Sequence, residues 1–169
     1  ISLGLVGSEM CIRDRKYQGS YEMIARFLDQ YSSVSMLDKV NYWQQVVFSW
    51  IIGNADMHLK NFSLYSIREG HYVLCPTYDQ VSTKIVMPED TEEVALSLNG
   101  FKKSLLVYDF REAMFSTGLS EVVANRILSG FAKFRDKWMV CIDNSFISDN
   151  QKEQCKKLID HRLETLAKE

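Results

Sequence analysis

Apolar side chains recur along the first half of the chain at the three- and four-residue spacing of helices. This pattern predicts a helix over residues 21–31, for which Ser20 is a suitable N-cap. A second, broader apolar face follows and stops at Gly53, a residue that commonly ends helices. Ser35 and Asp38 have the spacing of a capping box that would begin this second helix. The breadth of its apolar face indicates a helix buried in a core.

The next part of the chain has the pattern of a short β-hairpin. Residues 62–67 and 71–75 are two strand-like runs joined by residues 68–70. Gly70 can take the positive φ that a tight hairpin turn needs. Pro76 ends the second strand, because it has no N–H to donate to a neighbouring strand.

Helical spacing returns after the hairpin. Residues 77–91 have the composition of a loop, and residues 94–98 are a candidate short strand. Helices are then predicted over about 105–115 and 120–141, and Asp149 is expected to cap a last one. The fold class expected from this pattern is mainly α, with a small β-hairpin and no internal repeat.

Composition narrows the class of protein further. The 169 residues suffice for one domain, and 46% of them are hydrophobic, which argues against disorder. A net charge of −2 gives no basic field that would indicate nucleic-acid binding. The longest apolar run, residues 46–52, falls far short of the ~20 residues of a membrane span. The four cysteines form no C-x-x-C pair, which predicts a reducing, cytoplasmic setting. Cys75, Cys141 and Cys155 are expected to be small core residues.

Residues 1–15 are predicted to lie outside the fold. They have neither the basic start nor the cleavage site of a signal peptide, and Gly4-x-x-Gly7 matches no phosphate-binding loop. The part from Leu5 to Arg15 resembles a translated transposase adapter of the kind used in sequencing libraries. We therefore expect a non-native scar over residues 1–15 and a protein whose own sequence begins near Lys16, with its natural N-terminus missing.

The candidate chemistry lies between the second helix and the hairpin. Asp56 and Asn61 follow the order Asp-x-x-x-x-Asn of a kinase catalytic loop, in which the Asp accepts the substrate proton and the Asn holds Mg²⁺. Asp79 comes after the hairpin, where the same template has a second metal-binding Asp. Phosphoryl transfer needs a carboxylate beside the nucleophile and hard oxygen ligands on Mg²⁺. The sequence therefore predicts that these three side chains converge on one Mg²⁺ and phosphate site.

The same residues carry a family resemblance. Residues 52–63 contain Asp-x-His-x-Lys-Asn-Phe-Ser, and residues 76–79 read Pro-Thr-Tyr-Asp. Together they resemble the C-terminal part of HipA-type Ser/Thr protein kinases, the toxins of bacterial toxin–antitoxin modules. The Asp-x-His-x-x-Asn core is also similar to the catalytic loop of phosphoinositide kinases, where Arg usually stands at the place of Met57. The resemblance implies a helical kinase C-lobe over residues 16–169, with the N-lobe that binds most of the ATP absent, so that this chain alone is expected to be inactive.

The resemblance also implies roles for individual residues. Asp56 would be the catalytic base, Asn61 a Mg²⁺ ligand and Asp79 the principal Mg²⁺ ligand. His58 would lie beside the ATP phosphates at the catalytic centre, and Lys60 would offset carboxylate charge or touch a phosphate. Mg²⁺ and ATP are the implied cofactors. The implied partners are a protein substrate, such as an aminoacyl-tRNA synthetase, the missing N-terminal lobe and a helix-turn-helix antitoxin.

Other interpretations stay open at this point. Taken singly, Asp56 is more typical of a turn-capping residue and His58 of a core histidine. A second interpretation is a non-enzymatic binding or regulatory module, a pseudokinase lobe. Such a module need not keep Asp56, Asn61 and Asp79 together. A metal-dependent phosphohydrolase would use His58 with the two Asp, but such sites usually have more His and Asp ligands.

Overall fold

The computed structural model describes residues 16–168, so the predicted scar over residues 1–15 lies outside the described part. The chain begins with two helices, α2 (Tyr21–Tyr31) and α3 (Ser35–Ile51), followed by a 3-10 turn, η1 (Leu59–Asn61). A two-stranded antiparallel sheet comes next, made of β1 (Leu64–Arg68) and β2 (His71–Leu74). The remaining elements are helical: α4 (Thr83–Val86), α5 (Val107–Ser116), α6 (Glu121–Gly130), η2 (Ala132–Phe134), α7 (Arg135–Asp143) and α8 (Asp149–Ala167). The predicted fold class, mainly α with a small hairpin, is confirmed.

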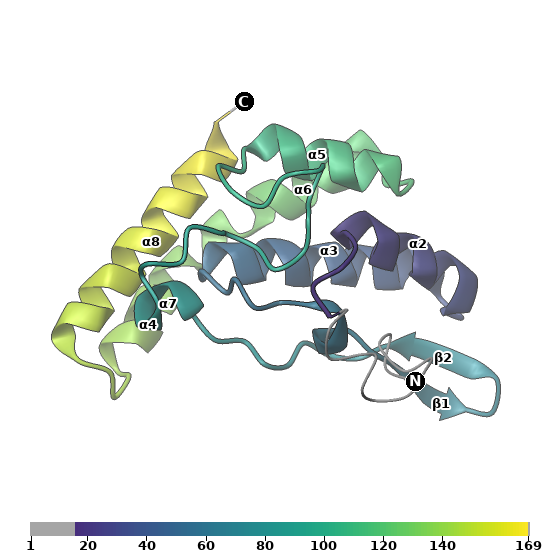
Figure 1. The fold of residues 1–169 in the computed structure, drawn as a ribbon, viewed down its shortest axis with the longest axis horizontal. Helices are drawn as coiled ribbons and strands as arrows, with labels where there is room; N and C mark the ends of the chain where they lie inside the picture. The colour runs from purple at the N-terminus through teal and green to yellow at the C-terminus, as the bar shows by residue number, and fades with distance from the viewer. Residues whose placement is uncertain (1–15, 169) are drawn as a thin grey trace.

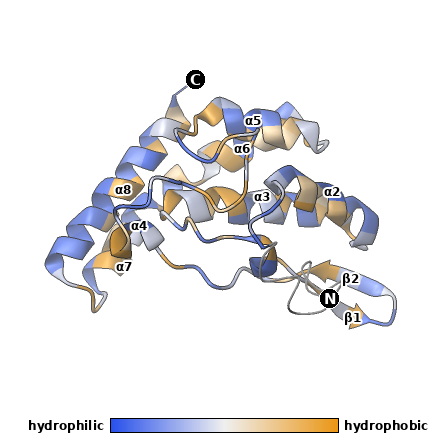
Figure 2. Cartoon of the chain, in the orientation of Figure 1, coloured by the Kyte–Doolittle hydropathy of each residue, from blue (hydrophilic) through white to orange (hydrophobic). Residues whose placement is uncertain are grey.

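Helix α3 lies at the centre of the arrangement (Figure 1). Helix α2 runs beside it, α5 and α6 form a layer on one side, and α8 crosses one end while the hairpin extends from the other. The segment from β2 through α4 passes along the remaining side of α3. Helix α8 is largely hydrophilic (Figure 2), and turns only a few apolar side chains to the core, among them Ile159, Leu163 and Leu166. Among residues 16–168, no helix combines the length and the apolar character needed to cross a membrane.

The first two helices follow the predicted pattern. The bounds of α2 match the prediction, and Ser20 caps it by accepting a hydrogen bond from the N–H of Met23. Trp43 and Trp50 of α3 are both fully buried, as a wide apolar face predicts. The capping box at Ser35 is wrong. The Asp38 carboxylate instead accepts hydrogen bonds from the Ser32 hydroxyl and, at 2.7 Å, from the N–H of Leu74, which joins α3 to β2.

The hairpin is present with slightly shorter strands than predicted. Leu64 pairs with Leu74 at its base, and Gly70 takes the expected positive φ of 74° in the turn. An irregularity lies between Ser66 and Arg68. Most of β1 is exposed, whereas β2 contacts the helical part of the chain through buried Leu74 and through hydrogen bonds between Tyr72 and Ser33.

The second half of the chain departs from the prediction in several places. Residues 94–98 form no strand but an irregular segment with two isolated bridges, Ser20 to Ser97 and Leu98 to Phe101, because neither bridge continues into a ladder. The helix predicted over 120–141 is broken after Gly130, and the aromatic rings of Phe131 and Trp138 pack against Phe48 of α3 at the break.

Three smaller expectations also change. Ser148 and not Asp149 caps α8, because Ser148 exchanges hydrogen bonds with Gln151 in a capping box. The loop predicted over 77–91 contains the short helix α4. Cys141 is exposed and not a core residue.

Gly53 is where three helices meet. It follows α3 with a φ of 74°, and its carbonyl accepts hydrogen bonds from the Thr83 hydroxyl at 3.1 Å and from the N–H of Lys84 at 3.0 Å. A Cβ at this position would lie 2.5 Å from the Leu158 side chain of α8 and 3.0 Å from Lys84 Cβ. Two independent requirements therefore favour glycine at this position: the positive φ of the backbone and the lack of space for a Cβ.

Gly53→Ala and Gly70→Ala should separate these two demands. Both glycines have a φ of 74°, but nothing lies within 4 Å of a Cβ at Gly70. We expect Gly70→Ala to lower the free energy of unfolding by about 1–2 kcal/mol, the cost of the left-handed conformation alone. Gly53→Ala should cost about 2–5 kcal/mol, because overpacking adds to that strain. Urea denaturation of both variants measures the difference, and equal costs would show that contact with α4 and α8 is unimportant.

A polar cluster inside the core connects α8 to α3. Arg162 of α8 forms an ion pair with Glu93, and its guanidinium lies 4.1 Å from the centre of the Trp50 ring. The indole N–H of Trp50 donates to the same Glu93 carboxylate at 2.8 Å. Burial by itself would raise the pKa of Glu93, but the hydrogen bonds from Arg162 and Trp50 outweigh it and hold the pKa below its ordinary value.

The lowered pKa of Glu93 predicts how stability responds to acid. The carboxylate stabilises the fold fully above its unfolded pKa of about 4.3, and this contribution is lost as the pH falls through the lower folded value. Glu93→Gln should therefore cost about 2–4 kcal/mol at pH 7, because it leaves Arg162 buried without its partner. Urea denaturation at pH 7 and at pH 3 should show the gap between wild type and variant shrinking in acid. Glu164→Gln, at an exposed site on α8, is the control and should leave both curves unchanged.

Candidate functional site

The loop between α3 and η1 is held from inside by Asn54, a residue that the sequence prediction did not include. Asn54 is almost fully buried. Its Oδ1 accepts a hydrogen bond from the N–H of Asp56 at 3.1 Å, and its Nδ2 donates to the carbonyl oxygen of Asp79, also at 3.1 Å. One amide side chain thus connects the backbones of both predicted acidic residues. The local signal for it, an Asn that can form an Asx turn after Gly53, was present in the sequence but says nothing about a partner 25 residues away.

Asn61 is oriented by the same loop. It ends η1, is buried, and donates from Nδ2 to the carbonyl oxygen of Asp56 at 3.0 Å. Because the amide nitrogen is engaged with the protein, the oxygen Oδ1 is the group left to accept or to coordinate. Among the described residues, no hydrogen bond engages that oxygen. Oδ1 of Asn61 is therefore available to a ligand, and its role as a metal ligand stays a prediction.

Met57 anchors the loop in the core. Its side chain is fully buried, although its neighbour Asp56 remains partly exposed. The Met57 sulfur receives contacts from Asn61 Nδ2 at 3.7 Å and from Gln80 Nε2 at 3.2 Å. Met57 therefore also links the loop to the segment that contains Asp79.

Asp79 has an unusual backbone. Its φ is +56°, a left-handed conformation that a residue with a Cβ adopts at some cost, and such positions are common at functional sites. The neighbouring Tyr78 hydroxyl donates to the carbonyl oxygen of Lys60 at 2.9 Å and lies 3.0 Å from the Ser63 hydroxyl. The Asp79 side chain is exposed, and within residues 16–168 it forms no hydrogen bond or ion pair. Its carboxylate is therefore free to bind a ligand.

Lys60 is placed differently from the other predicted residues. Its backbone receives the Tyr78 hydroxyl, but across the described chain its side chain forms no ion pair. The structure does not bring its ammonium group to Asp56 or Asp79. In this conformation Lys60 therefore forms no ion pair with Asp56 or Asp79 that would offset their charge.

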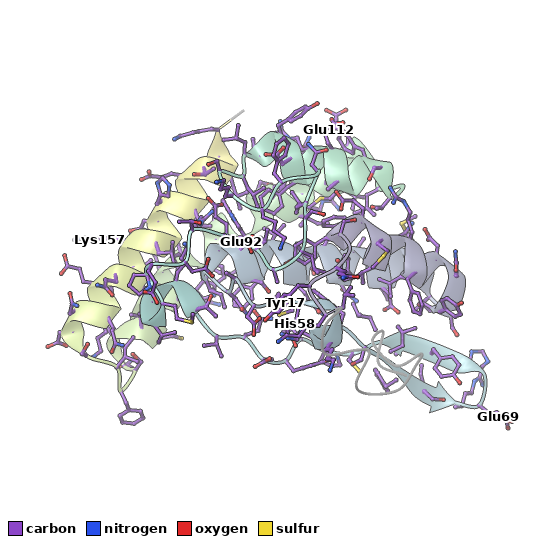
Figure 3. All side chains as sticks on the ribbon, in the orientation of Figure 1. Tyr17, His58, Glu69, Glu92, Glu112 and Lys157 are labelled. Carbon is purple, nitrogen blue, oxygen red and sulfur yellow. The ribbon has the colours of Figure 1, made fainter. Side chains whose placement is uncertain are left out.

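His58 is two residues from Asp56, and its backbone N–H donates to the Asp56 carbonyl. Its ring is largely buried, its Nδ1 has no hydrogen-bond partner in the described part of the chain, and the Tyr17 ring contacts it edge-on at 5.4 Å (Figure 3). Burial lowers the pKa of His58 below its ordinary value, while the charges of Asp56 and, more weakly, Asp79 act in the opposite direction. The imidazole is therefore neutral at pH 7 and has one ring nitrogen available to accept and one to donate.

Tyr17 is the second residue that the sequence prediction missed. Its hydroxyl donates a hydrogen bond to Oδ1 of Asp56 at 2.7 Å, across 39 residues of sequence. Nothing in the spacing of the motif points to it, because it comes from the segment before α2. The contact shows that a hydroxyl can reach the predicted base.

Two of the predicted residues are suited to hold a magnesium ion. No group of three or more His, Cys, Asp or Glu side chains in residues 16–168 could hold a metal. Mg²⁺ seldom needs such a group, since it is usually held by one or two protein oxygens, water and substrate phosphates. Oδ1 of Asn61 and the carboxylate of Asp79 are oxygen donors of this kind, and both are free of other partners in the described chain. The donor set therefore fits Mg²⁺ bound together with a phosphate ligand.

The sequence matches the HipA-like C-terminal domain family over residues 3–138, most of the chain. The chain belongs to this family. The match begins inside residues 1–15, so the adapter interpretation of that segment stays a prediction. The family resemblance seen in the sequence is confirmed.

Two curated relatives, both named "putative kinase", are similar to parts of the chain. The one from Haemophilus influenzae is 28% identical over 121 residues, which cover 72% of this chain and 34% of that protein. The one from Sinorhizobium fredii is 41% identical over 91 residues, which cover 53% of this chain and 22% of that protein. The HipA-like chain therefore spans about a third or less of these relatives.

A solved structure shares the fold. A chain from the Shewanella oneidensis toxin–antitoxin complex of HipA, HipB and operator DNA superposes with a TM-score of 0.71, covering 95% of this chain and 38% of that one. At 18% identity the likeness supports the fold and not the chemistry. The roles of Asp56, His58, Lys60, Asn61 and Asp79 remain predictions, which the geometry above makes specific.

The electrostatics of His58 provide a direct check on this geometry. The charge of Asp56 raises the pKa of His58 and partly offsets the effect of burial. Asp56→Asn should therefore lower the pKa of His58 further, which NMR titration of the His Cε1–H signals measures. Asp136→Asn removes a carboxylate that is 94% exposed on α7 and should leave the titration unchanged. An unchanged His58 titration in Asp56→Asn would show that the two side chains are farther apart than the structure places them.

Proposed function

We propose that this chain is the C-terminal lobe of a HipA-like protein kinase that transfers the γ-phosphoryl group of ATP to a serine or threonine hydroxyl with the help of Mg²⁺. The main support is the set of hydrogen bonds that joins the loop 54–61 to the segment 78–80, from Asn54 to Asp79, from Tyr78 to Lys60 and from Gln80 to Met57. These bonds join the loop that carries Asp56 and Asn61 to the segment that carries Asp79, which supports a shared site for the three side chains. Phosphoryl transfer depends on such positioning more than on any covalent step.

Each side chain has a separate part in this proposal. Asp56 accepts the proton of the acceptor hydroxyl, because one of its oxygens already takes a hydrogen bond from a hydroxyl at 2.7 Å. Asn61 and Asp79 hold the metal ion, which when bound neutralises charge on the phosphates. His58, whose pKa is lowered by burial, donates a hydrogen bond to a phosphate oxygen without adding charge. Lys60, whose side chain is unpaired in the described chain, is available to reach the same phosphates.

The partners follow from the relatives as proposals. The matched regions cover only 34% and 22% of the two curated relatives, so we assign the phosphate-covering loop and the ATP-anchoring lysine to a further lobe. The Shewanella oneidensis protein was solved with HipB and operator DNA. We extend that arrangement to a helix-turn-helix antitoxin for this chain, and we retain an aminoacyl-tRNA synthetase as the substrate suggested by the family.

Kinase activity of the full-length protein tests the proposal. The upstream coding sequence of the locus would be restored, and phosphate transfer from labelled ATP to protein would be followed with and without Mg²⁺. Asp56→Asn should slow transfer by about 10²–10⁴-fold, because it removes the general base. Asp79→Asn should slow it by a similar factor and should also weaken the dependence on Mg²⁺, because it removes a metal ligand.

Asp136→Asn is the matched control for both variants and should transfer phosphate at the wild-type rate, since its carboxylate is 94% exposed and remote from the loop. An Asp79→Asn enzyme with full rate would rule out the assigned site. A full-length wild type that binds ATP and Mg²⁺ without transferring phosphate would instead support the non-enzymatic, pseudokinase alternative.

A further inference from the structure

Tyr21, the first residue of α2, uses every one of its polar groups in a hydrogen bond. Its backbone N–H donates to the Ser97 carbonyl at 3.0 Å, and its backbone carbonyl accepts the Tyr42 hydroxyl at 2.9 Å. Its own hydroxyl donates to the carbonyl oxygen of Met57 at 3.0 Å, across 36 residues of sequence. The start of α2 is thereby attached to the loop that follows α3.

The Tyr21 hydroxyl is buried with the rest of its side chain, which is 1% exposed. Burial raises the pKa of this phenol well above its ordinary value, and the charge of Asp56 acts in the same direction. Hydrogen bonding to the backbone of Leu96 and Ala95 opposes this rise but does not cancel it. The phenol is therefore a neutral hydrogen-bond donor at pH 7, and it lies close enough to Asp56 to respond to its charge.

The peptide group between Met57 and His58 is held at both ends. Its carbonyl accepts the Tyr21 hydroxyl, and its N–H donates to the Asp56 carbonyl at 2.8 Å. Because a peptide group is planar and rigid, any rotation of it would disturb both bonds together. Within residues 16–168 no other group donates to the Met57 carbonyl, so without the Tyr21 hydroxyl a buried acceptor would be left unpaired.

The aromatic ring of Tyr21 has a separate packing role. The Phe62 ring, which directly follows Asn61 in the chain, lies 6.2 Å from the Tyr21 ring and 5.0 Å from the Tyr42 ring between centroids. These contacts do not involve either hydroxyl. A phenylalanine in place of either tyrosine would therefore retain the packing and remove a single hydrogen bond.

We propose that Tyr21 is a positioning residue for phosphoryl transfer, whose hydroxyl fixes the peptide group between the predicted base Asp56 and His58. The inference rests on the proposed function and adds to it a residue that acts only through the loop. By holding that peptide plane, Tyr21 sets the direction in which the Asp56 side chain leaves the backbone. A misplacement of about 1 Å in such a site costs about 10²-fold in rate.

Tyr21→Phe and Tyr42→Phe form a matched pair for the test. Both tyrosines are fully buried and each hydroxyl donates to one backbone carbonyl, but only the Tyr21 hydroxyl reaches the loop. In the full-length protein, both variants should lower the urea midpoint, because each leaves a buried carbonyl with one partner fewer. Tyr21→Phe should also lower kcat by about 10- to 100-fold with KM for ATP changed by less than about 2-fold. Tyr42→Phe should retain the wild-type kcat.

Hydrogen exchange of the loop gives a readout that does not need catalysis. The N–H groups of His58 and Asn61 donate within the loop, to the carbonyls of Asp56 and His58. Their exchange would be followed by mass spectrometry on peptides that cover residues 56–61 of the full-length protein. It should be about 5- to 30-fold faster in Tyr21→Phe and should stay at the wild-type rate in Tyr42→Phe.

Three results would overturn the inference: a wild-type kcat in Tyr21→Phe, an equal loss of kcat in both variants, or loop exchange in Tyr21→Phe at the wild-type rate. An equal loss would show that any weakening of the core slows the reaction. A full-length wild type that transfers no phosphate, together with faster loop exchange in Tyr21→Phe alone, would instead overturn the proposed function. The attachment of the loop to α2 through Tyr21 would then stand by itself.

Discussion

The end of α3 at Gly53 is the constraint on which the arrangement of the site depends. The glycine turns the chain with a positive φ, and the Leu158 side chain leaves no space for a Cβ. Its carbonyl accepts two hydrogen bonds from the start of α4, at Thr83 and Lys84. The loop that carries Asp56 therefore leaves α3 from a point that is also fixed to the segment after Asp79. Two parts of the sequence that are separated by the hairpin are thus held in a fixed position relative to each other.

A buried polar cluster gives the core its specificity around this point. Directional contacts connect three parts of the chain here: Trp50 in α3, Glu93 in the loop that follows α4, and Arg162 in α8. Apolar packing alone tolerates several arrangements of helices, whereas a buried ion pair left without its partner costs several kcal/mol. We interpret this cluster as the reason that α8 crosses α3 at a single position. That crossing in turn places Leu158 against Gly53.

Local patterns predicted those parts of the molecule whose structure is decided locally. The apolar spacing and the Ser20 cap gave the bounds of α2, and the order of Asp56, Asn61 and Asp79 gave a loop and a segment that do lie together. The cap of α8 and the short helix α4 were missed locally, but the larger failures concern contacts between distant residues. Asp38 was expected to cap its own helix but binds the backbone of β2, and Tyr17 and Asn54 act across 39 and 25 residues. The break after Gly130 is similarly decided by the packing of Phe131 on Phe48, which helical spacing does not reveal.

The hydrogen bonds at the site share a pattern that explains how structure and chemistry coexist there. Asn54, Asn61 and Tyr78 each donate to a backbone carbonyl, those of Asp79, Asp56 and Lys60. The loop is thereby ordered without using the carboxylates for its own stability, and the left-handed backbone of Asp79 is held by a bond to its carbonyl. A loop stabilised through its carboxylates would need their charge for folding and would lose it to a metal or a substrate. Here the two carboxylates take no part in these bonds, and Asn61 orders the loop through Nδ2 while its Oδ1 stays free, so a ligand can bind while the hydrogen bonds of the loop stay intact.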